Sequence, residues 1–366
     1  MKKVAFISFG CKVNSAETDT MIAQLADLAE AKYCKTTTDA DIVIVNTCAV
    51  TEKAQKEGER YLRTLKEKKP ACTIIATGCM AELYKGNEAA IGADMLVPNV
   101  AKGELLRVLF PKSNVGARPT ARAAKPAKTR AFLKIQDGCD AFCTYCIIPS
   151  LRGAPTSISE DEAVAAFQRL LCEGYKEIVL TGIHIGLYES GLDKLLARLI
   201  ALDGEFRIRL SSLYVTEITD ELIQIVARSN GKIAPHFHIS LQSGSTEILR
   251  RMGRKYSASK AEELIHKLRK EIADVTIGAD IIVGFPDEGI ALFLKTLHFV
   301  ESCKFDFLHV FPYSARPNTP AASYDDQIPQ EEKLSRARML RGTGNALQRQ
   351  SAERLVGQTV RVLTEK

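Results

Sequence analysis

The sequence contains no apolar run that approaches the roughly 20 residues of a membrane-spanning helix. Its first apolar stretch covers only residues 4–9, which is too short for a secretory signal and better suited to a first β-strand. The composition, with 46% hydrophobic and 26% charged residues among 366, excludes collagen-like, disordered and coiled-coil proteins. We therefore expect a cytoplasmic protein with no membrane contact and with room for two domains.

The chain also has little need of disulfides. A protein of this length buries a core without covalent staples, so its ten cysteines are expected to be thiols, metal ligands or redox groups. Four of these cysteines follow no pattern, and we predict that they are core residues: Cys34, Cys72, Cys172 and Cys303.

Acidic residues are absent from residues 111–136, where seven basic residues lie among Ala, Pro and Gly. Since the net charge is +6, the rest of the chain sums to −1. The composition indicates an extended linker between domains. It is either simply solvated or a strap that follows the phosphates of a nucleic acid. On the second interpretation, the predicted nucleic-acid contacts are Arg118, Arg122, Lys125, Lys128 and Arg130.

Three cysteines follow strand-like segments in the first 110 residues. VAFISFG leads to Cys11, IVIVNT to Cys48 and TIIATG to Cys79. Helical patterns over residues 15–31 and 51–68, with Ser15 and Thr51 as expected caps, alternate with these strands and indicate a parallel α/β sheet. The carboxyl ends of such strands converge on one crevice, so the topology should bring the three cysteines together. Three thiolates suit a 4Fe-4S cluster with one open iron, and three buried apolar cysteines are the alternative.

A second set of cysteines has a motif spacing. Cys139, Cys143 and Cys146 form C-x3-C-x2-C after a strand-like segment. No second C-x2-C pair lies nearby, which disfavours a zinc ribbon, and bacterial ferredoxins use a different spacing. The motif is typical of radical S-adenosylmethionine (SAM) proteins, with aromatic Tyr145 before the third cysteine. There the open iron is chelated by the amino and carboxylate groups of SAM.

The remainder of the chain predicts a partial barrel. Strand-like segments alternate with helical ones, and this makes six βα units, whose active site should lie at the carboxyl ends of the strands. The predicted strands cover residues 131–136, 177–181, 207–212, 236–241, 276–284 and 307–312.

Residues 1 to about 356 resemble the methylthiotransferases, radical SAM enzymes with an additional N-terminal cluster domain. The resemblance is carried by FGCKVNSAET, NTCAVT, TGCMAE, KIQDGCDAFCTYCIIP, LTGIHIGLY, LQSGS, RMGRKY and HVFPYSARPNTPAA. Within the family, GCKVN, TGIH and HVFPYS are similar to the branch that modifies N6-threonylcarbamoyladenosine at position 37 of tRNA. The branches that act on isopentenyladenosine or on a ribosomal-protein aspartate are less similar and remain alternatives.

The resemblance implies a domain order and two ligand sets. It implies a flavodoxin-like open parallel sheet domain over residues 1–110, a basic linker over 111–130 and a radical SAM partial (βα)6 TIM barrel over 131–356. Residues 357–366 would begin a TRAM β-barrel that is otherwise essentially absent. The SAM-cleaving 4Fe-4S cluster would be held by Cys139, Cys143 and Cys146, and the auxiliary 4Fe-4S cluster by Cys11, Cys48 and Cys79. The SAM pocket would be lined by Tyr145, Gly182, Ser211, Gln242 and Gly284.

The implied reaction uses two SAM molecules. One methylates a sulfur on the auxiliary cluster, and the other supplies the 5′-deoxyadenosyl radical that takes hydrogen from C2 of the adenine. The implied partners are the anticodon loop of tRNA and a low-potential electron donor such as a flavodoxin or ferredoxin, for a chain expected to be a monomer. No catalytic residue is assigned beyond the cluster ligands, and the histidines are predicted to pack or to form hydrogen bonds: His184, His236, His238 and His309.

Several features depart from the family pattern, among them the segment Ala154–Ser157 after Arg152-Gly153, where a basic, serine-containing segment is common. Asp287 stands where GFPGE has a glycine, and Tyr214 stands where SSIE has a glutamate, which puts a SAM- or substrate-facing role of residue 214 in doubt. From another class of function, a non-catalytic iron–sulfur electron carrier, an RNA-binding module and a zinc-binding RNA protein are the alternatives.

Overall fold

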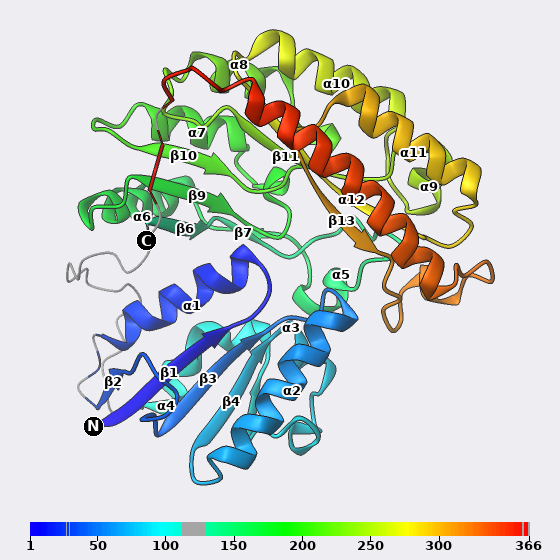
Figure 1. Ribbon diagram of the computed structural model, residues 1–366. Helices are drawn as coiled ribbons and strands as arrows, with labels where there is room; N and C mark the ends of the chain where they lie inside the picture. Colours follow the sequence, from blue (N-terminus) through cyan, green and yellow to red (C-terminus); the bar gives the residue numbers. More distant parts are fainter. Residues whose placement is uncertain (27, 29, 112–128, 361, 365–366) are drawn as a thin grey trace.

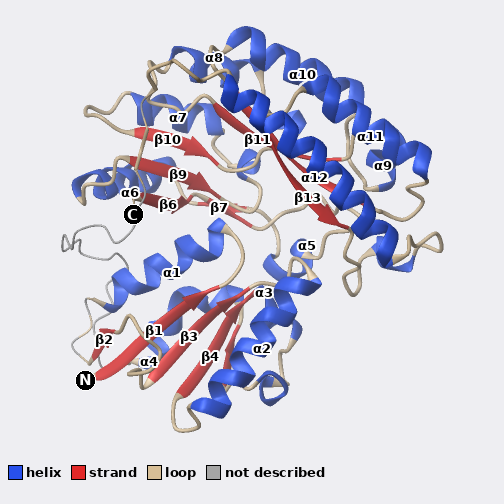
Figure 2. Ribbon diagram, in the orientation of Figure 1, coloured by secondary structure: helices blue, strands red, loops and turns tan. Residues whose placement is uncertain are grey.

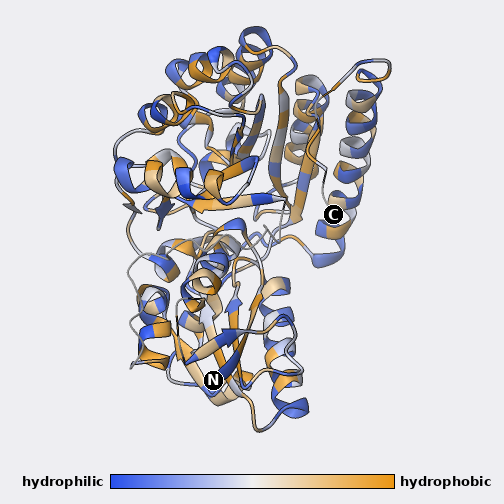
Figure 3. Ribbon diagram, turned by 90° about the vertical axis from the view of Figure 1, so that its left-hand side faces the viewer, coloured by the Kyte–Doolittle hydropathy of each residue, from blue (hydrophilic) through white to orange (hydrophobic). Residues whose placement is uncertain are grey.

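The computed structural model describes residues 1–26, 28, 30–111, 129–360 and 362–364. It contains two α/β halves, one above the other in Figure 1, with helices flanking the strands in both (Figure 2). In the N-terminal half, predominantly hydrophobic strands lie between helices of mixed polarity (Figure 3). Four of the predicted nucleic-acid contacts lie outside the described residues: Arg118, Arg122, Lys125 and Lys128.

The N-terminal half is a five-stranded parallel sheet with strand order β2-β1-β3-β4-β5. This is the flavodoxin-like order, so the predicted fold of this half is confirmed. The strands are β1 (Lys2–Ser8), β2 (Ala31–Tyr33), β3 (Ile42–Thr47), β4 (Thr73–Gly78) and β5 (Met95–Val97). The helices are α1 (Lys12–Leu25), α2 (Glu52–Lys68), α3 (Cys79–Leu83) and α4 (Leu105–Leu109).

Strand β3 shows why the sheet is covered on both faces. Every residue of β3 is buried. Val43 and Val45 pack with Leu62 of α2, whereas Ile44 packs on the opposite face with Leu25 of α1. Because successive side chains of a strand point to opposite faces, a continuous β-branched run requires a helix layer on each side.

The second half is a six-stranded open barrel. Its strands form the parallel sheets β10-β9-β6 and β11-β12-β13. The sheets are joined by the bridges Ile208↔Ile233 and Leu213↔Ile239, so all six predicted strands lie in one array. The strands are β6 (Arg130–Lys134), β9 (Glu177–Thr181), β10 (Arg207–Leu210), β11 (His236–Gln242), β12 (Thr276–Val283) and β13 (Phe307–Pro312).

Helices cover the outer face of this barrel (Figure 1). They are α6 (Glu160–Cys172), α7 (Leu192–Ile200), α8 (Asp220–Arg228), α9 (Thr246–Arg251), α10 (Ala258–Glu271), α11 (Ile290–Cys303) and α12 (Gln330–Glu353). Between β6 and α6 lie the short antiparallel pair β7 (Gln136–Asp137) and β8 (Thr156–Ser157), and the helix α5 (Ile148–Arg152). Among the described residues, no helix has the length and apolarity of a bilayer-spanning segment.

Three local predictions are wrong. The first helix begins at Lys12 and is preceded by Cys11, so Ser15 lies inside it and caps nothing. Cys172 is exposed and Cys34 is half-buried. Thr51 does cap α2 by accepting the Ala54 N–H, and the burial of Cys72 and Cys303 agrees with core positions. The described residues after Gly357 form no strand, and Arg361 lies outside them, so the predicted first TRAM strand is not observed there.

Candidate functional site

The two cysteine triads lie at the carboxyl ends of the two sheets, which face each other across α3 and α5 (Figure 1). Helix α5 packs on α3, and α1 packs on β6. One apolar cluster joins the two edges, because it contains Cys79 and Met80 of α3 together with Cys139 and with Ile148 and Leu151 of the α5 segment. Both sets of thiols therefore border the same interface between the halves.

The first triad lies in the loop between β7 and α5. Cys139 is 6% and Cys143 is 4% exposed, and Cys146 is half-buried. The Thr144 backbone N–H donates to the Met252 carbonyl at 3.0 Å and its hydroxyl to the Arg251 carbonyl at 2.8 Å, which anchors the loop on α9. The fixed loop holds three thiols close enough for electrostatic interaction.

The second triad is assembled from three different strand ends. Cys11 immediately precedes α1, Cys48 immediately follows β3, and Cys79 is the first residue of α3. A Cβ at Gly10 would lie 2.6 Å from the Cys48 sulfur, which shows how closely the first two loops approach. Cys11, Cys48 and Cys79 interact electrostatically, so the sheet topology brings together the cysteines that lie far apart in the sequence.

The residues of both triads fit metal-cluster ligands. Burial raises the pKa of Cys48 to about 11 and that of Cys146 to about 12, so these sulfurs are neutral thiols until a metal displaces their protons. In the described part of the chain, neither triad has its three sulfurs within 4.8 Å of one another. Three cysteine ligands without a fourth suit a cluster with one open iron better than a structural tetrahedral zinc ion.

A buried ion network connects the second triad to the α5 segment. The Arg152 side chain is 0% exposed, and its Nε donates to the Cys79 sulfur at 3.4 Å. Its Nη1 contacts Glu17 and Asp137 at 2.9 Å each, and its Nη2 donates to Asn14 Oδ1 at 2.7 Å. Burial opposes the charge of Arg152, but Cys79, Glu17 and Asp137 raise its pKa.

The network has an excess of positive charge. Lys102 pairs with Glu17 at 2.6 Å, and Lys134 pairs with Glu17 and Asp137 at 2.9 Å each. Burial alone would raise the pKa of Glu17, but these lysines and Arg152 hold it well below its usual range. Three cations against two carboxylates leave one positive charge beside Cys79, which suits an anionic thiolate ligand.

His184 and Glu217 lie beside the first triad. His184 Nδ1 lies 3.3 Å from the Cys139 sulfur, and its Nε2 pairs with Glu217. Burial opposes protonation, but the hydrogen bonds to Cys139 and Glu217 raise the pKa of His184 to about 9. The predicted hydrogen-bonding role of His184 is confirmed.

At residue 214, where the family pattern has a glutamate, the tyrosine makes its own contacts with the first triad. The Tyr214 ring stacks on His184 with centroids 3.9 Å apart, and its hydroxyl lies 3.8 Å from the Cys143 sulfur. Glu217, three residues later, accepts the Tyr214 backbone N–H at 3.0 Å, and Gly186 leaves the space that its carboxylate fills. A carboxylate is therefore still present beside the loop, supplied by residue 217.

Arg254 also lies beside the first triad. Its Cζ lies 4.0 Å from the Tyr214 ring centroid, and its Nη2 donates to the Ser240 carbonyl at 2.8 Å. Among the described residues, its buried Nε and Nη1 have no hydrogen-bond partner. A buried guanidinium with free N–H groups beside Cys143 and Cys146 fits an anionic ligand, such as the carboxylate of SAM.

Four of the five predicted SAM-pocket residues lie at the carboxyl ends of barrel strands, and Tyr145 lies in the cysteine loop. Gly182 follows β9, and Ser211 follows β10 with a buried hydroxyl that has no partner in the described structure. Gln242 ends β11 with φ +75°, and Gly284 follows β12 with φ +70°. Tyr145 is half-buried and packs against a small apolar cluster that includes Met252 and Phe285. Their contacts with SAM stay a prediction.

Asp287 has φ +67°, a left-handed conformation that glycine adopts more readily. This explains structurally why glycine suits the position. Asp287 pairs with Arg251 at 3.1 Å, a contact that glycine could not make.

Gly78 fixes the position of Cys79. Its φ of +93° and ψ of −168° are accessible essentially only to glycine, and a Cβ there would collide with the Thr47 backbone. We expect Gly78→Ala to lower the free energy of unfolding by roughly 3 kcal/mol in urea titrations. The control is Gly86→Ala, with φ +81° and no atom within 4 Å of the new Cβ, which should cost only about 1 kcal/mol. Equal losses would contradict the steric argument.

Glu288 supports the strand end at Gly284. It accepts the Gly284 N–H and pairs with Arg336 of α12 at 3.0 Å, fully buried. Burial raises its pKa to about 7, against the opposing effects of Gly284 and Arg336. The folded protein thus keeps a proton that the unfolded chain releases near pH 4.5, so this contribution to stability falls as pH rises from about 4.5 to 7.

We therefore expect Glu288→Gln to remove a decline in unfolding free energy on the order of 2 kcal/mol between pH 5 and 7.5. Urea titrations at several pH values measure it. Glu331→Gln, at an exposed position of α12, should keep the wild-type slope. Equal slopes in both variants would show that Glu288 is already ionised at pH 5.

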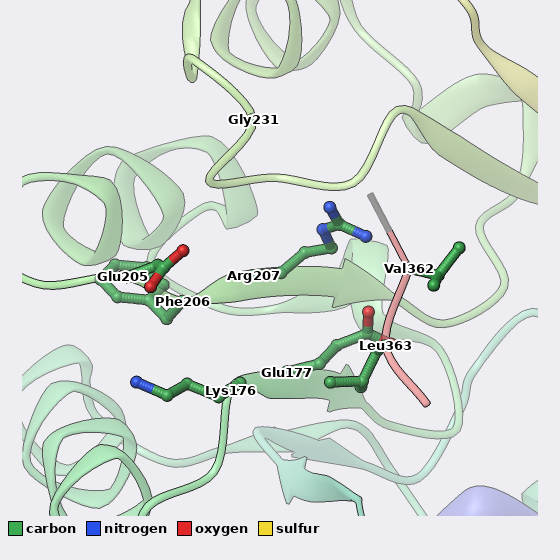
Figure 4. Close-up of a pocket in the computed structure, with 8 residues that line it drawn as sticks. All are labelled: Lys176, Glu177, Glu205, Phe206, Arg207, Gly231, Val362 and Leu363. Carbon is green, nitrogen blue, oxygen red and sulfur yellow. The ribbon is translucent and has the colours of Figure 1, made fainter. Parts of the chain in front are cut away.

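A further pocket lies away from the cysteine triads. A cavity of about 190 Å³ is found at the amino ends of β9 and β10, opposite the cysteine edge (Figure 4). It is lined by Lys176, Glu177, Glu205, Phe206, Arg207, Gly231, Val362 and Leu363. Arg130, predicted to contact nucleic acid, pairs with Glu177 at 2.9 Å, and its contact with RNA stays a prediction.

Comparison with known proteins agrees with this architecture. Residues 133–300 match the radical SAM superfamily, and residues 3–97 match the uncharacterized protein family UPF0004. In solved structures, the radical SAM methyltransferase TsrM from Kitasatospora setae has a similar fold, with a TM-score of 0.67 at 13% identity over 88% of this chain and 77% of that one.

Curated relatives match this chain over nearly its whole length. The threonylcarbamoyladenosine tRNA methylthiotransferases MtaB of Bacillus subtilis and Thermotoga maritima are 37% and 36% identical over 100% of this chain, and over 85% and 87% of their own lengths. The tRNA-2-methylthio-N(6)-dimethylallyladenosine synthase of Endomicrobium trichonymphae is 32% identical over 98% of this chain and 88% of its own length. On the fold, the paired cysteine sites and these relatives, the chain belongs to the radical SAM methylthiotransferase family.

Proposed function

We propose that this enzyme inserts a methylthio group at C2 of N6-threonylcarbamoyladenosine 37 in the anticodon loop of tRNA. The observation that carries the proposal is the pair of thiol triads on one domain interface, linked through Arg152 and Cys79. A transfer that needs a sulfur source and a radical source within reach of one adenine requires such an arrangement. The relatives with the highest identities here act on threonylcarbamoyladenosine by name, which favours this substrate.

In this proposal the two triads hold different groups. Cys139, Cys143 and Cys146 hold a 4Fe-4S cluster that binds SAM, and Cys11, Cys48 and Cys79 hold the auxiliary 4Fe-4S cluster. When bound, these groups supply the methyl group, the sulfur and the 5′-deoxyadenosyl radical, with electrons from a flavodoxin- or ferredoxin-type donor. The protein's own part is to exclude water through the apolar interface and to place its buried cations, Arg152 and Arg254, beside the anionic groups.

Nucleoside analysis of tRNA tests the substrate. Reconstituted enzyme is incubated with SAM, a reductant and tRNA that carries either N6-threonylcarbamoyladenosine or isopentenyladenosine at position 37. We expect the threonylcarbamoyl nucleoside alone to gain the mass of a methylthio group in place of one hydrogen. Conversion of the isopentenyl nucleoside instead would assign the enzyme to the other tRNA branch. Conversion of neither, with a ribosomal protein methylthiolated, would remove tRNA as the substrate.

A further inference from the structure

Polar and aromatic side chains of three barrel strands, β11, β12 and β13, lie together on the inner face of the barrel. This is the face turned away from the helices. Ile277, Ala279 and Ile281 of β12 point outward into the core shared with α10 and α11. The intervening Gly278 and Asp280 therefore face inward. Register pairs Asp280 with His309, and Gly278 with His238 and Phe307. We call the inward set the inner-face cluster: His236, His238, Asp280, Phe307 and His309.

Asp280 holds this cluster together. Its Oδ1 lies 2.8 Å from His238 Nε2 and 3.2 Å from His309 Nδ1. His309 remains 52% exposed although it lies in the middle of a barrel strand. The ring of Phe307 lies over Gly278, where any Cβ would collide with it, and it stacks on His236 with centroids 5.4 Å apart. The result is a flat aromatic wall beside accessible polar atoms, a surface suited to a heterocyclic base with polar substituents.

The cluster also contains one buried nitrogen that lacks a hydrogen-bond partner in the described structure. His236 Nδ1 is buried and has no hydrogen-bond partner among the described residues. Buried polar groups are rarely left unpaired, so this nitrogen can accept a partner that the described residues do not supply, either an ordered water or a bound molecule.

The charge beside the cluster is positive. Arg130 and Arg209 share Glu177, at 2.9 and 3.0 Å. Lys12 begins α1, which packs on β6 and β9, and it interacts electrostatically with Asp280, Arg209 and Arg130. In the described structure its side chain has neither an ion pair nor a hydrogen bond. Arg130 and Arg209 are already paired with Glu177, whereas Lys12 has no ion-pair partner among the described residues.

We propose that the inner-face cluster binds the N6 side chain of the substrate nucleoside and that Lys12 binds its carboxylate. This inference rests on the proposed function. N6-threonylcarbamoyladenosine ends in a carboxylate and a hydroxyl, whereas the isopentenyl group is a hydrocarbon. Lys12 directly follows Cys11, so the carboxylate is held next to the edge that carries the second triad. Lys12 thus selects the substrate by charge.

Equilibrium dialysis with the free nucleoside tests the contact directly. Reconstituted protein is dialysed against N6-threonylcarbamoyladenosine and, separately, against its methyl ester, which has lost the negative charge. We expect Lys12→Gln to weaken binding of the acid about tenfold and to leave binding of the ester unchanged, because one charge-assisted hydrogen bond is lost. Lys12→Arg should retain most of the affinity. Lys53→Gln, at an exposed position of α2, should match wild type with both ligands.

Other outcomes overturn the proposal. Equal affinity of wild type for acid and ester, or equal weakening of both by Lys12→Gln, would mean that Lys12 binds no carboxylate. Because His238, Asp280 and His309 have their ligand atoms within 4.8 Å, a chelator is included; nucleoside binding abolished by EDTA at full iron content would assign the cluster to a metal ion instead. The iron content of Lys12→Gln is measured in parallel, so that loss of a cluster next to Cys11 is distinguished from loss of carboxylate binding.

Failure of this inference differs from failure of the proposed function. In tRNA assays, Lys12→Gln should raise KM for threonylcarbamoyladenosine tRNA about tenfold and change kcat little. If wild-type enzyme converts this tRNA and Lys12→Gln is equally efficient, only the inference fails. If wild-type enzyme does not convert it at all, the proposed function itself fails.

Discussion

Replacing Cys11, Cys48 and Cys79 by alanine together will abolish methylthio transfer to tRNA and leave SAM cleavage intact. On the proposed assignment, this variant keeps the cluster ligands at residues 139–146 and loses the sulfur-bearing site. Wild type should hold about eight irons per chain after anaerobic reconstitution, and this variant about four. The variant should still form 5′-deoxyadenosine but no methylthio nucleoside. The reciprocal variant with alanine at Cys139, Cys143 and Cys146 should also hold about four irons and should form neither product.

The control for cysteine removal is Cys34→Ala/Cys172→Ala. These two cysteines lie away from both triads, one half-buried and one exposed, so the double variant should keep about eight irons and full activity. About four irons in wild type, falling to none in the 139/143/146 variant, would show that the N-terminal triad holds no cluster. The methylthiotransferase mechanism proposed for this chain would then fail.

Arg152→Met will lower the free energy of unfolding by roughly 3–5 kcal/mol. The side chain is fully buried between the halves, and its loss leaves Glu17 and Asp137 with one cation fewer and Cys79 without its N–H donor. Removing the guanidinium leaves buried oxygens of Asn14, Glu17 and Asp137 without their charged N–H donors, and a buried polar atom left unsatisfied costs far more than the hydrogen bond itself contributes. Urea titration of protein without clusters measures the loss.

Arg198→Met provides the matched control. Arg198 also pairs with two carboxylates, those of Glu160 and Asp161, but its side chain is 42% exposed. Its replacement should cost far less stability than that of Arg152, because water solvates the carboxylates left behind. If the two methionine variants lose the same stability, burial of the Arg152 network is not what makes it important.

The sequence allows the fold and both triads to be predicted, because each depends on local patterns. Strand-like runs that end in Cys11, Cys48 and Cys79 need only the rule that parallel strands share a carboxyl edge. The spacing of the second triad is itself a motif. These features require no knowledge of which side chains meet across the molecule.

Contacts between distant residues could not be predicted in the same way. Arg152 and Glu17 are 135 residues apart, and nothing in either segment indicates that they meet. The sequence at residue 214 suggests only a lost glutamate, whereas the structure brings Glu217 to the same loop through a short turn, Val215–Glu217. The expected cap at Ser15 is wrong because Cys11, a poor capping residue, ends the loop that reaches the site, and α1 begins directly after it.

The Arg152 network also limits how modules of this family can be exchanged. Asn14 and Glu17 belong to the first helix of one half, and Asp137 and Arg152 to the segments around the cysteine loop of the other. A chimera that joins the N-terminal half of this chain to the barrel of a relative must transplant these four residues as one unit. Without them, the interface between the two halves would bury charged side chains that lack partners, however well each half folds on its own.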